Sequence, residues 1–369
     1  MKLMYLLPAL SSGGVEQVVL ELCQGIAGQG EAECVVVSAG GGMVELIEST
    51  GARHIRRPLE KKSPFLIKEI WRLAKLLQRE APDIVHVHSR IPAWVAHFAL
   101  RLLPPGRKPV LVSTFHGFHS VNNYSAIMTH GAAVIAVSRS MREHILTHYP
   151  HTPAERIRVI PNSVDTEQNY PGFTPSAEWQ QRWQSAFPEL AGKFTLCLPG
   201  RISRIKGSAH LVPILTELHR RGIPAHAVIV GETKRGKEKI RRELEDAFAA
   251  AGLRDHITWT GHRRDLREVL ASCSVTLSLT LQPESFGKTT LEALALGRPV
   301  AGYAHGGVAE QLEQFLPEGL IPVGDTAAMA ARLAEWHQRP PALSRPVGSP
   351  YLRQDMIRAH MALYRELLS

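Results

Sequence analysis

Two carboxylates and a lysine are closely spaced in residues 283–294. Glu284 and Glu292 stand eight residues apart, and a helix is expected to begin near Gly287. Lys288 then falls in the first turn of this helix, where its charge opposes the helix dipole unless an anion is bound. A carboxylate accepts several hydrogen bonds and so suits paired hydroxyl groups. The segment predicts a site for a ligand with phosphate and hydroxyl groups; the alternative is a capped surface helix whose acids are there by chance.

Two further turns have residue types that suit ligand binding. Residues 200–207 follow an apolar run and contain Arg201 and Lys206, a natural clamp for a diphosphate, with solvated loop charges as the alternative. Gly13 and Gly14 follow the first apolar run, where they let a ligand approach the backbone or simply form a tight turn. The dinucleotide fingerprint GxGxxG is absent, which disfavours a nicotinamide or flavin enzyme.

The elements that must position these residues alternate along the chain. Unbroken apolar runs between amphipathic helices are typical of parallel sheets covered on both faces, so an α/β fold is expected. Ligands of such sheets bind at the carboxyl ends of the strands, where all three turns lie. The expected strands are residues 3–7, 34–37, 84–87, 110–113, 134–137, 194–198, 227–230, 257–259, 275–279, 299–302 and 320–323. The expected helices include residues 15–27, 66–79, 139–147, 291–296 and 352–368.

The length of 369 residues favours two domains. The alternation stops near residues 162–165 and resumes at Phe194, and a proline-rich stretch follows residue 339. The expected N-terminal domain is residues 1–165, and the expected C-terminal domain is residues 166–349. Residues 350–369 are expected to form a helix that crosses back to the first domain.

Composition narrows the class of protein. Hydrophobic residues make up 44% and charged residues 21%, as in a soluble globular enzyme, and no apolar run is long enough to cross a bilayer. The four cysteines form no CxxC pair and are expected to be buried thiols of a cytoplasmic protein. The net charge of +9 favours an anionic partner, but the basic stretches lack the interleaved aromatic residues of a nucleic-acid binder, so no nucleic acid is expected.

Histidine is abundant, with 18 residues, which raises the alternative of a metal site. His86 and His88 share one side of a strand, and His116 and His119 follow the next strand. No carboxylate or thiol is spaced to complete a zinc site with them, so the prediction is that no metal is bound and that these histidines are buried or line a cleft.

These motifs together resemble the family-4 retaining glycosyltransferases of GT-B fold. The resemblance rests on Glu284-x7-Glu292, Arg201, Lys206 and the Gly13-Gly14 turn. It extends over nearly the whole chain, through residues 83–88, 115–117, 137–138, 161–165 and 261–262, and residues 283–310 are most similar to bacterial lipopolysaccharide-core sugar transferases. It implies two Rossmann-like domains whose parallel sheets face each other across a cleft, of which the N-terminal domain binds the acceptor and the C-terminal domain binds the nucleotide sugar donor.

The resemblance also implies the role of each residue. Arg201 and Lys206 hold the donor diphosphate, Glu292 binds the ribose, and Glu284 contacts the transferred sugar. The other implied donor contacts are Gly14, His262, Arg263, Ser285, Phe286, Gly287, Lys288 and Thr289. His116 joins Glu284, Arg201 and Lys206 as catalytic residues, and Gly13 and His116 meet the acceptor. Two departures from the family pattern are the basic loop 231–237, which lacks the usual second glycine, and His305, where a small or acidic residue is usual.

The implied activity is retaining transfer of a hexosyl group without a metal or other cofactor, since no DxD motif occurs. The donor is a nucleotide diphosphate sugar, with UDP favoured over GDP. The acceptor is a glycolipid or an oligosaccharide of lipopolysaccharide core or another cell-envelope glycan. The alternatives are a soluble acceptor, as in a sucrose-phosphate-synthase-like enzyme, and a non-catalytic partner subunit that binds a nucleotide sugar.

A mixed basic and apolar segment points to the membrane. Its cations are Arg53, Arg56, Arg57, Lys61 and Lys62, and Trp71 follows in the next helix. Such segments suit the headgroup boundary of an anionic bilayer, whereas the alternative is a solvated basic face. The expected location is the cytoplasm, with peripheral attachment to the inner face of the cytoplasmic membrane.

Overall fold

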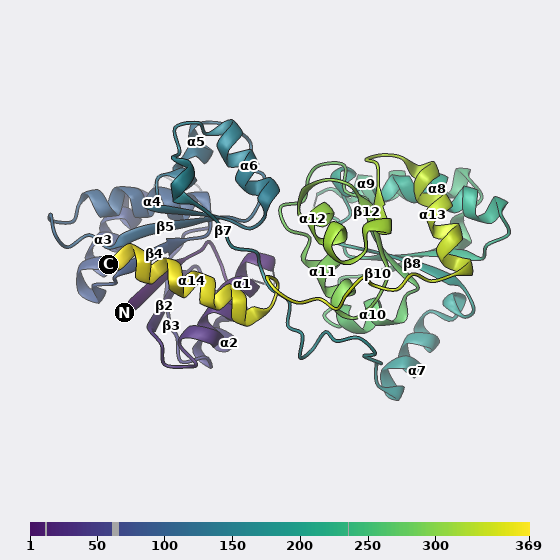
Figure 1. The fold of residues 1–369 in the computed structure, drawn as a ribbon, viewed down its shortest axis with the longest axis horizontal. Helices are drawn as coiled ribbons and strands as arrows, with labels where there is room; N and C mark the ends of the chain where they lie inside the picture. The colour runs from purple at the N-terminus through teal and green to yellow at the C-terminus, as the bar shows by residue number, and fades with distance from the viewer. Residues whose placement is uncertain (12, 61–65, 235) are drawn as a thin grey trace. The chain divides into compact units, whose positions relative to one another are not determined.

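The computed structural model describes residues 1–369 except for residues 12, 61–65 and 235. The chain divides into two compact units (Figure 1). The first unit combines residues 1–163 with residues 349–369, and the second unit is residues 164–348. The division after Ser163 lies close to the boundary expected at residue 165.

The first unit has a parallel sheet of seven strands in its described part, in the order β3-β2-β1-β4-β5-β6-β7. The strands are β1 (Lys2–Leu6), β2 (Glu33–Ser38), β3 (Arg53–Arg56), β4 (Ile84–Val87), β5 (Val110–Phe115), β6 (Ala133–Ala136) and β7 (Ile157–Val159). The helices are α1 (Gly14–Ile26), α2 (Val44–Glu48), α3 (Leu66–Glu80), α4 (Arg90–Arg101), α5 (Asn123–Ala126), α6 (Arg139–His148) and α14 (Arg353–Leu368). The order of the strands reverses beside β1, which is where open parallel sheets bind ligands.

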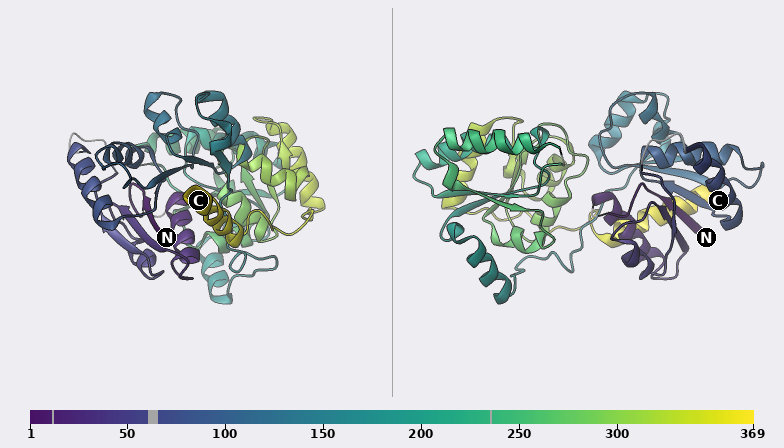
Figure 2. Two further views of the ribbon diagram at one scale, coloured as in Figure 1. Left: turned by 60° about the vertical axis from the view of Figure 1, so that its left-hand side comes forward. Right: turned by 180° about the vertical axis from the view of Figure 1, so that it is seen from behind.

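Two hydrophobic cores cover the two faces of this sheet because side chains alternate along each strand. Met4 and Leu6 of β1 pack with α3 and α4, whereas Leu3 and Tyr5 of the same strand pack with α1 and α14. Helix α14 lies beside α1, and its Tyr364 is fully buried (Figures 1 and 2). The first unit therefore takes one of its covering helices from the far end of the sequence.

The second unit has a parallel sheet of six strands in its described part, in the order β10-β9-β8-β11-β12-β13. The strands are β8 (Phe194–Pro199), β9 (Ala225–Val230), β10 (Ile257–Gly261), β11 (Val275–Ser278), β12 (Val300–Tyr303) and β13 (Leu320–Ile321). The helices are α7 (Ala177–Ala186), α8 (Leu211–Arg220), α9 (Glu238–Ala250), α10 (Leu266–Ser272), α11 (Lys288–Ala295), α12 (Gly306–Phe315) and α13 (Thr326–Gln338). The prediction of an α/β protein with two parallel sheets is confirmed.

The differences from the sequence prediction lie at the sheet edges. Strands β3 and β7 were not predicted, and both are edge strands of the first sheet. An edge strand is covered on fewer sides, so β3, with the sequence RHIR, lacks the continuous apolar run that marks a central strand. The edge strand β13 was predicted over residues 320–323 but ends at Ile321.

A close crossing of α1 and α14 depends on Gly25. A Cβ atom at this position would overlap the side chain of Ile357 in α14. Glycine is unfavourable inside a helix, so its presence here marks a contact that leaves no room for a side chain.

We expect Gly25→Val to destabilise the first unit by about 1–3 kcal/mol, because Ile357 must move out of a packed core. The control is Gln24→Val, which places the same β-branched residue at an exposed position of the same helix. Urea unfolding followed by circular dichroism measures both variants. Equal midpoints for the two variants would contradict the close crossing.

Candidate active site

Three loops meet at one edge of the second sheet because they follow strands that are neighbours in a parallel sheet. Strands β8, β11 and β12 lie side by side, and the loops that follow them begin at Gly200, Leu279 and Ala304. Two of these loops contain the cationic turn and the paired carboxylates predicted to form a ligand site. The fold therefore brings the two segments together.

The contact between these two loops is an ion pair. Lys206 Nζ lies 2.9 Å from Glu284 Oε1, and the two side chains are 31% and 27% exposed. The backbone N–H of Leu281 also donates to the carbonyl of Ile205 at 2.7 Å. A partly exposed ion pair contributes little to stability, so an incoming anion can compete for the ammonium group.

Lys206 lies close to the start of its own loop. Its side chain lies over Gly200, where a Cβ atom would be 3.9 Å from Nζ. Gly200 adopts φ +128°, a conformation that favours glycine. The next residue is Arg201, whose side chain is exposed. The chain thus places two cations at the carboxyl end of β8.

Two glycines allow the loops to approach this closely. Gly207 has φ +66°, and a Cβ atom there would overlap the carbonyl oxygen of Leu279. Gly306 has φ +63°, and a Cβ atom there would overlap the carbonyl oxygen of Glu284. No role was predicted for either glycine. Both lie in loops that follow predicted strands, and a glycine at such a position is the sequence signal by which they could have been found.

The backbone around Glu284 is held by α12. The N–H of Gly307 donates to the Glu284 carbonyl at 2.7 Å, and Gln311 Nε2 donates to the Phe286 carbonyl at 2.7 Å. Gln311 is fully buried, and sequence reasoning missed it because a single glutamine within a helix carries no signal. His305 Nε2 lies 2.7 Å from the Thr280 carbonyl oxygen, which connects the same two loops.

Helix α11 begins directly after this anchored segment. Its N-cap is Gly287 at φ +85°, a residue without a side chain that could cap the first turn. Phe286 is only 4% exposed, so its ring belongs to the core. Ser285, Lys288, Thr289 and Glu292 are all partly exposed around the helix start. Exposed N–H groups at a helix N-terminus form a ready anion site.

His262 and Arg263 follow β10, two strands from β8. The backbone N–H of His262, which was expected to face the nucleobase, donates to Glu232 Oε1 at 3.3 Å. This N–H group is therefore already bonded to a carboxylate. The Arg263 guanidinium pairs with Asp265, with Nε 2.9 Å from Oδ1, and lies over the ring of Trp183. The side chain of Arg263 therefore binds within its own unit, and sequence reasoning missed Glu232.

In the first unit, Gly13 and Gly14 form the start of α1. Gly13 is the N-cap in an extended conformation, and a Cβ atom there would overlap the carboxylate of Glu16. Burial raises the pKa of this Glu16 carboxyl. Gly14 borders open space, since a Cβ atom there would meet no described atom of another part of the chain within 4 Å. The neighbouring Ser12 of this turn lies outside the described residues.

His116 follows β5 and belongs to a cluster of imidazoles. Its Nε2 lies 2.9 Å from His88 Nδ1, and the two rings stack with centroids 5.2 Å apart. His86 binds the Tyr364 hydroxyl of α14 through Nδ1 and Thr114 Oγ1 through Nε2, both at 2.7 Å. Burial, with a smaller effect of the neighbouring histidines, lowers the pKa of His116 to about 3. The imidazole of His116 is thus neutral at physiological pH.

The alternative of a zinc site finds no support in this cluster. The hydrogen bonds above occupy both nitrogens of His86 and join His88 to His116. Among the residues that the structure describes, no group of three or more His, Cys, Asp and Glu side chains has an arrangement that could hold a metal ion.

Two family models match the chain, one for each unit. Glycosyltransferase Family 4 matches residues 12–168, and Glycosyl transferases group 1 matches residues 193–339. A curated relative is the 2-deoxystreptamine N-acetyl-D-glucosaminyltransferase of Streptomyces fradiae, which is 26% identical over 90% of this chain and 86% of its own length. The chain is a glycosyltransferase.

Solved structures share the fold. A glycosyltransferase from Rickettsia africae ESF-5 superposes with TM-score 0.82 at 22% identity, covering 100% of this chain and 98% of that chain. Anabaena HepE in complex with UDP-glucose superposes with TM-score 0.76 at 18% identity, covering 99% of this chain and 100% of that chain. The lipopolysaccharide outer core galactosyltransferase WaaB superposes with TM-score 0.71 at 16% identity, covering 98% of this chain and 100% of that chain. These likenesses establish the GT-B fold, with its two Rossmann-like domains.

We expect the stability of the first unit to fall as the pH drops below about 6.5. Burial lowers the pKa of His360 to about 4, so between these values the unfolded chain binds a proton that the folded unit does not. Each pH unit in this window removes up to about 1.4 kcal/mol per such histidine. His360→Gln should flatten the dependence of the thermal midpoint on pH between 7 and 5, whereas His151→Gln at an exposed position should not. An unchanged slope in His360→Gln would contradict this account.

Proposed function

We propose that this glycosyltransferase moves a hexosyl group from a nucleotide diphosphate sugar to an acceptor hydroxyl with retention of configuration. The bond between the anomeric carbon and the diphosphate oxygen breaks, and a bond to the acceptor oxygen forms on the same face. The acceptor proton passes to the departing phosphate oxygen. The observation that carries the proposal is the Lys206–Glu284 pair beside the start of α11, because it joins a cation, a carboxylate and a helix N-terminus at one strand edge.

The electrostatics of this edge support diphosphate departure. Arg201 and Lys206 supply two positive charges, and the N-terminus of α11 adds the positive end of a helix dipole. Glu292, one turn into α11, is the proposed acceptor of hydrogen bonds from the ribose hydroxyls. These groups neutralise the leaving charge without a metal, so we infer that none is required. UDP is the proposed nucleotide, as in the complex of Anabaena HepE with UDP-glucose.

Two kinds of acceptor are proposed. A membrane glycolipid of the cell envelope is favoured by the outer face of α3, where Ile67 and Trp71 are 67% and 58% exposed beside the exposed cations Lys68 and Lys75. Apolar and basic residues on one helix face suit a bilayer headgroup region. The second candidate is a small soluble acceptor, because the Streptomyces relative is named for 2-deoxystreptamine.

One cation of the expected basic cluster before α3 is paired within its own unit. Arg53 pairs with Glu33 at 2.9 Å and with Glu80, and the hydrogen bond from Arg53 helps to lower the pKa of Glu80 to about 2. Lys2 and Arg79 share these carboxylates, so three cations surround two carboxylates. Arg56 is exposed and Arg57 partly exposed. Lys61 and Lys62 lie outside the described residues. In the described part of the chain, no helix is both long enough and apolar enough to span a bilayer.

Lys206→Met and Glu284→Gln should differ in effect. Lys206→Met removes a cation from the proposed diphosphate site, so UDP binding should weaken by about tenfold to a hundredfold, as for a charged hydrogen bond worth about 1.5–3 kcal/mol. Glu284→Gln should leave the affinity for UDP within about threefold and slow transfer, because the carboxylate contacts the sugar. Calorimetry with UDP and a product assay measure the two effects. If Glu284→Gln abolished UDP binding, the placement of the sugar would be wrong.

Transfer should continue in excess chelator. The assay compares the rate of UDP release from UDP-glucose, with either acceptor class, before and after treatment with EDTA. A rate that falls and returns with magnesium or manganese would refute the metal-independent mechanism. Binding of UDP-glucose without turnover on both acceptor classes would instead identify a non-catalytic sugar-nucleotide-binding subunit.

The double variant Ile67→Ser/Trp71→Ser should lose binding to vesicles that contain an anionic lipid. The matched control is Leu46→Ser, which removes another apolar side chain that is 52% exposed. Co-sedimentation at low and high salt measures binding, and salt should weaken it because each basic residue contributes about 1 kcal/mol at an anionic surface. Equal binding of wild type and the double variant would contradict docking through α3, and failure of both proteins to bind at low salt would favour the soluble acceptor.

A further inference from the structure

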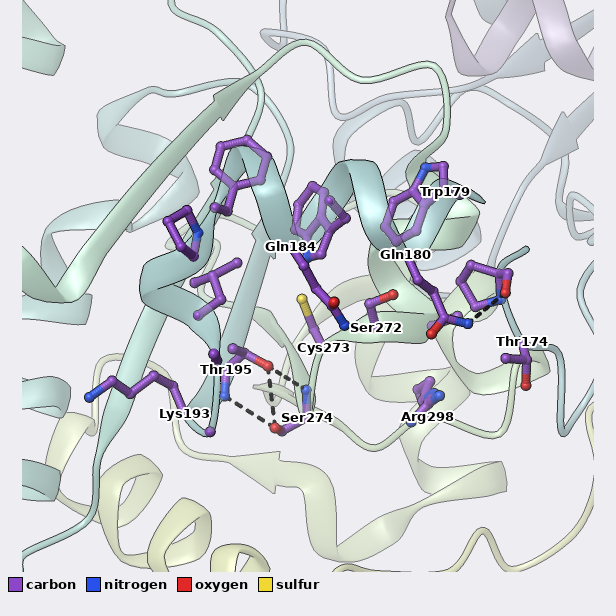
Figure 3. A pocket seen from close by; sticks show the side chains of 18 residues that line it. Thr174, Trp179, Gln180, Gln184, Lys193, Thr195, Ser272, Cys273, Ser274 and Arg298 are labelled. Atoms are coloured by element: carbon purple, nitrogen blue, oxygen red, sulfur yellow. Dashed lines mark hydrogen bonds between the residues drawn. The ribbon is translucent and has the colours of Figure 1, made fainter. Parts of the chain in front are cut away.

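A cavity of about 510 Å³ lies in the second unit, between α7 and the amino-terminal edge of the sheet (Figure 3). Its lining includes Thr195 at the start of β8, Ser274 just before β11 and Arg298 just before β12. The proposed donor site lies at the carboxyl ends of these same strands. Because β8 is six residues long, the two sites are separated by roughly 20 Å along the strand direction.

One wall of the cavity is aromatic and held in place. The rings of Trp179 and Trp183 stack with centroids 5.1 Å apart and planes 13° apart, and Phe187 lies 4.6 Å from Trp183. Trp179 Nε1 donates to Asp265 Oδ2 at 2.7 Å, and the Arg263 guanidinium lies over Trp183. These contacts fix the two indoles. A flat apolar ligand can therefore bind beside them without the entropy cost of ordering these side chains.

The charge of the cavity is positive. Its lining contains Arg298 and Lys193 and neither an aspartate nor a glutamate among the described residues. Arg298 is half-buried, and no hydrogen bond or ion pair joins its guanidinium to a described side chain, while its backbone N–H is fixed on the Ala293 carbonyl at 2.9 Å. Burial lowers the pKa of Arg298, which shows that its charge is poorly solvated. A poorly solvated cation without a counter-ion favours an anionic ligand.

The remaining polar groups point to a small charged head on the ligand. The hydroxyls of Thr195 and Ser274 are bonded to each other and to backbone N–H groups. Gln180 donates to the Pro175 carbonyl at 2.7 Å, and Gln184 reaches from α7 toward Ser272 (Figure 3). Arg298, Gln184 and the exposed Lys193 thus offer donors to a ligand, and Arg298 is the half-buried cation among them. The volume is within the range of small-molecule sites.

We propose that this cavity is a second binding site, for an aromatic anion whose ring packs on the Trp183 wall and whose phosphate or carboxylate binds Arg298. The inference goes beyond the proposed transfer reaction and does not depend on it. Phenyl phosphate is a suitable probe, since it combines one ring with one phosphate. Two of the six tryptophans of the chain line the cavity, so intrinsic fluorescence reports binding.

The test is a fluorescence titration with phenyl phosphate in the presence and absence of saturating UDP. We expect saturable quenching that UDP does not alter. Inorganic phosphate and phenol, measured by competition, should bind at least about tenfold more weakly, because phosphate lacks the ring and phenol lacks the anionic group. Quenching that UDP abolishes would place the probe in the donor site, and equal affinities for phenyl phosphate and phosphate would leave the aromatic wall without a role. Either result overturns the proposal, as does the absence of quenching.

Variants locate the site. Arg298→Met should raise the dissociation constant about tenfold or more, whereas Arg254→Met, which removes an exposed arginine outside the cavity, should leave it unchanged. Gln184→Ala is an exposed substitution that does not disturb the core and should weaken binding about threefold, which keeps the test decisive if Arg298→Met does not fold. Unchanged binding in a folded Arg298→Met, or in Gln184→Ala when Arg298→Met does not fold, would overturn the proposal.

Discussion

The close approach of three loops at the carboxyl edge of the second sheet is the constraint on which the proposed donor site depends. The ion pair between Lys206 and Glu284 joins the loop after β8 to the loop after β11, and the N–H of Gly307, after β12, donates to the Glu284 carbonyl. Both close contacts between loops need a glycine, because a Cβ atom at Gly207 would overlap the backbone of Leu279 and a Cβ atom at Gly306 would overlap the backbone of Glu284. The glycines make the pair possible, and the pair in turn orients a cation and a carboxylate beside the start of α11.

The two units have different kinds of polar side chains at the carboxyl edges of their sheets. The second unit keeps the side chains of its Lys206–Glu284 pair partly exposed. The first unit buries imidazoles, and burial lowers the pKa values of His86, His88 and His116. The first edge therefore has neutral imidazoles that accept or donate hydrogen bonds.

The sequence predicted central features better than peripheral ones, for physical reasons. Strands such as β4, predicted at residues 84–87, are buried on both faces and carry continuous apolar runs, whereas β3 and β7 lie at the edges and do not. The segments around Lys206 and Glu284 were predicted to share a site because adjacent parallel strands end together. The contacts of Glu232 and Gln311 were not predictable, since they depend on how loops distant in sequence pack. Arg263 shows the same limit: its position was expected, but its pairing with Asp265 was not.

The helix α14 makes the first unit discontinuous, and this affects how the chain can fold as it is synthesised. Met356, Met361, Leu363 and Tyr364 of α14 complete a core whose other buried residues precede residue 163, and Arg365 and Glu366 pair with Glu31 and Arg158. The whole second unit emerges from the ribosome between these parts. It can close its own core while the face of the first sheet that α14 covers is still open. Domains usually fold in the order of their synthesis; here the second unit can be complete before the first.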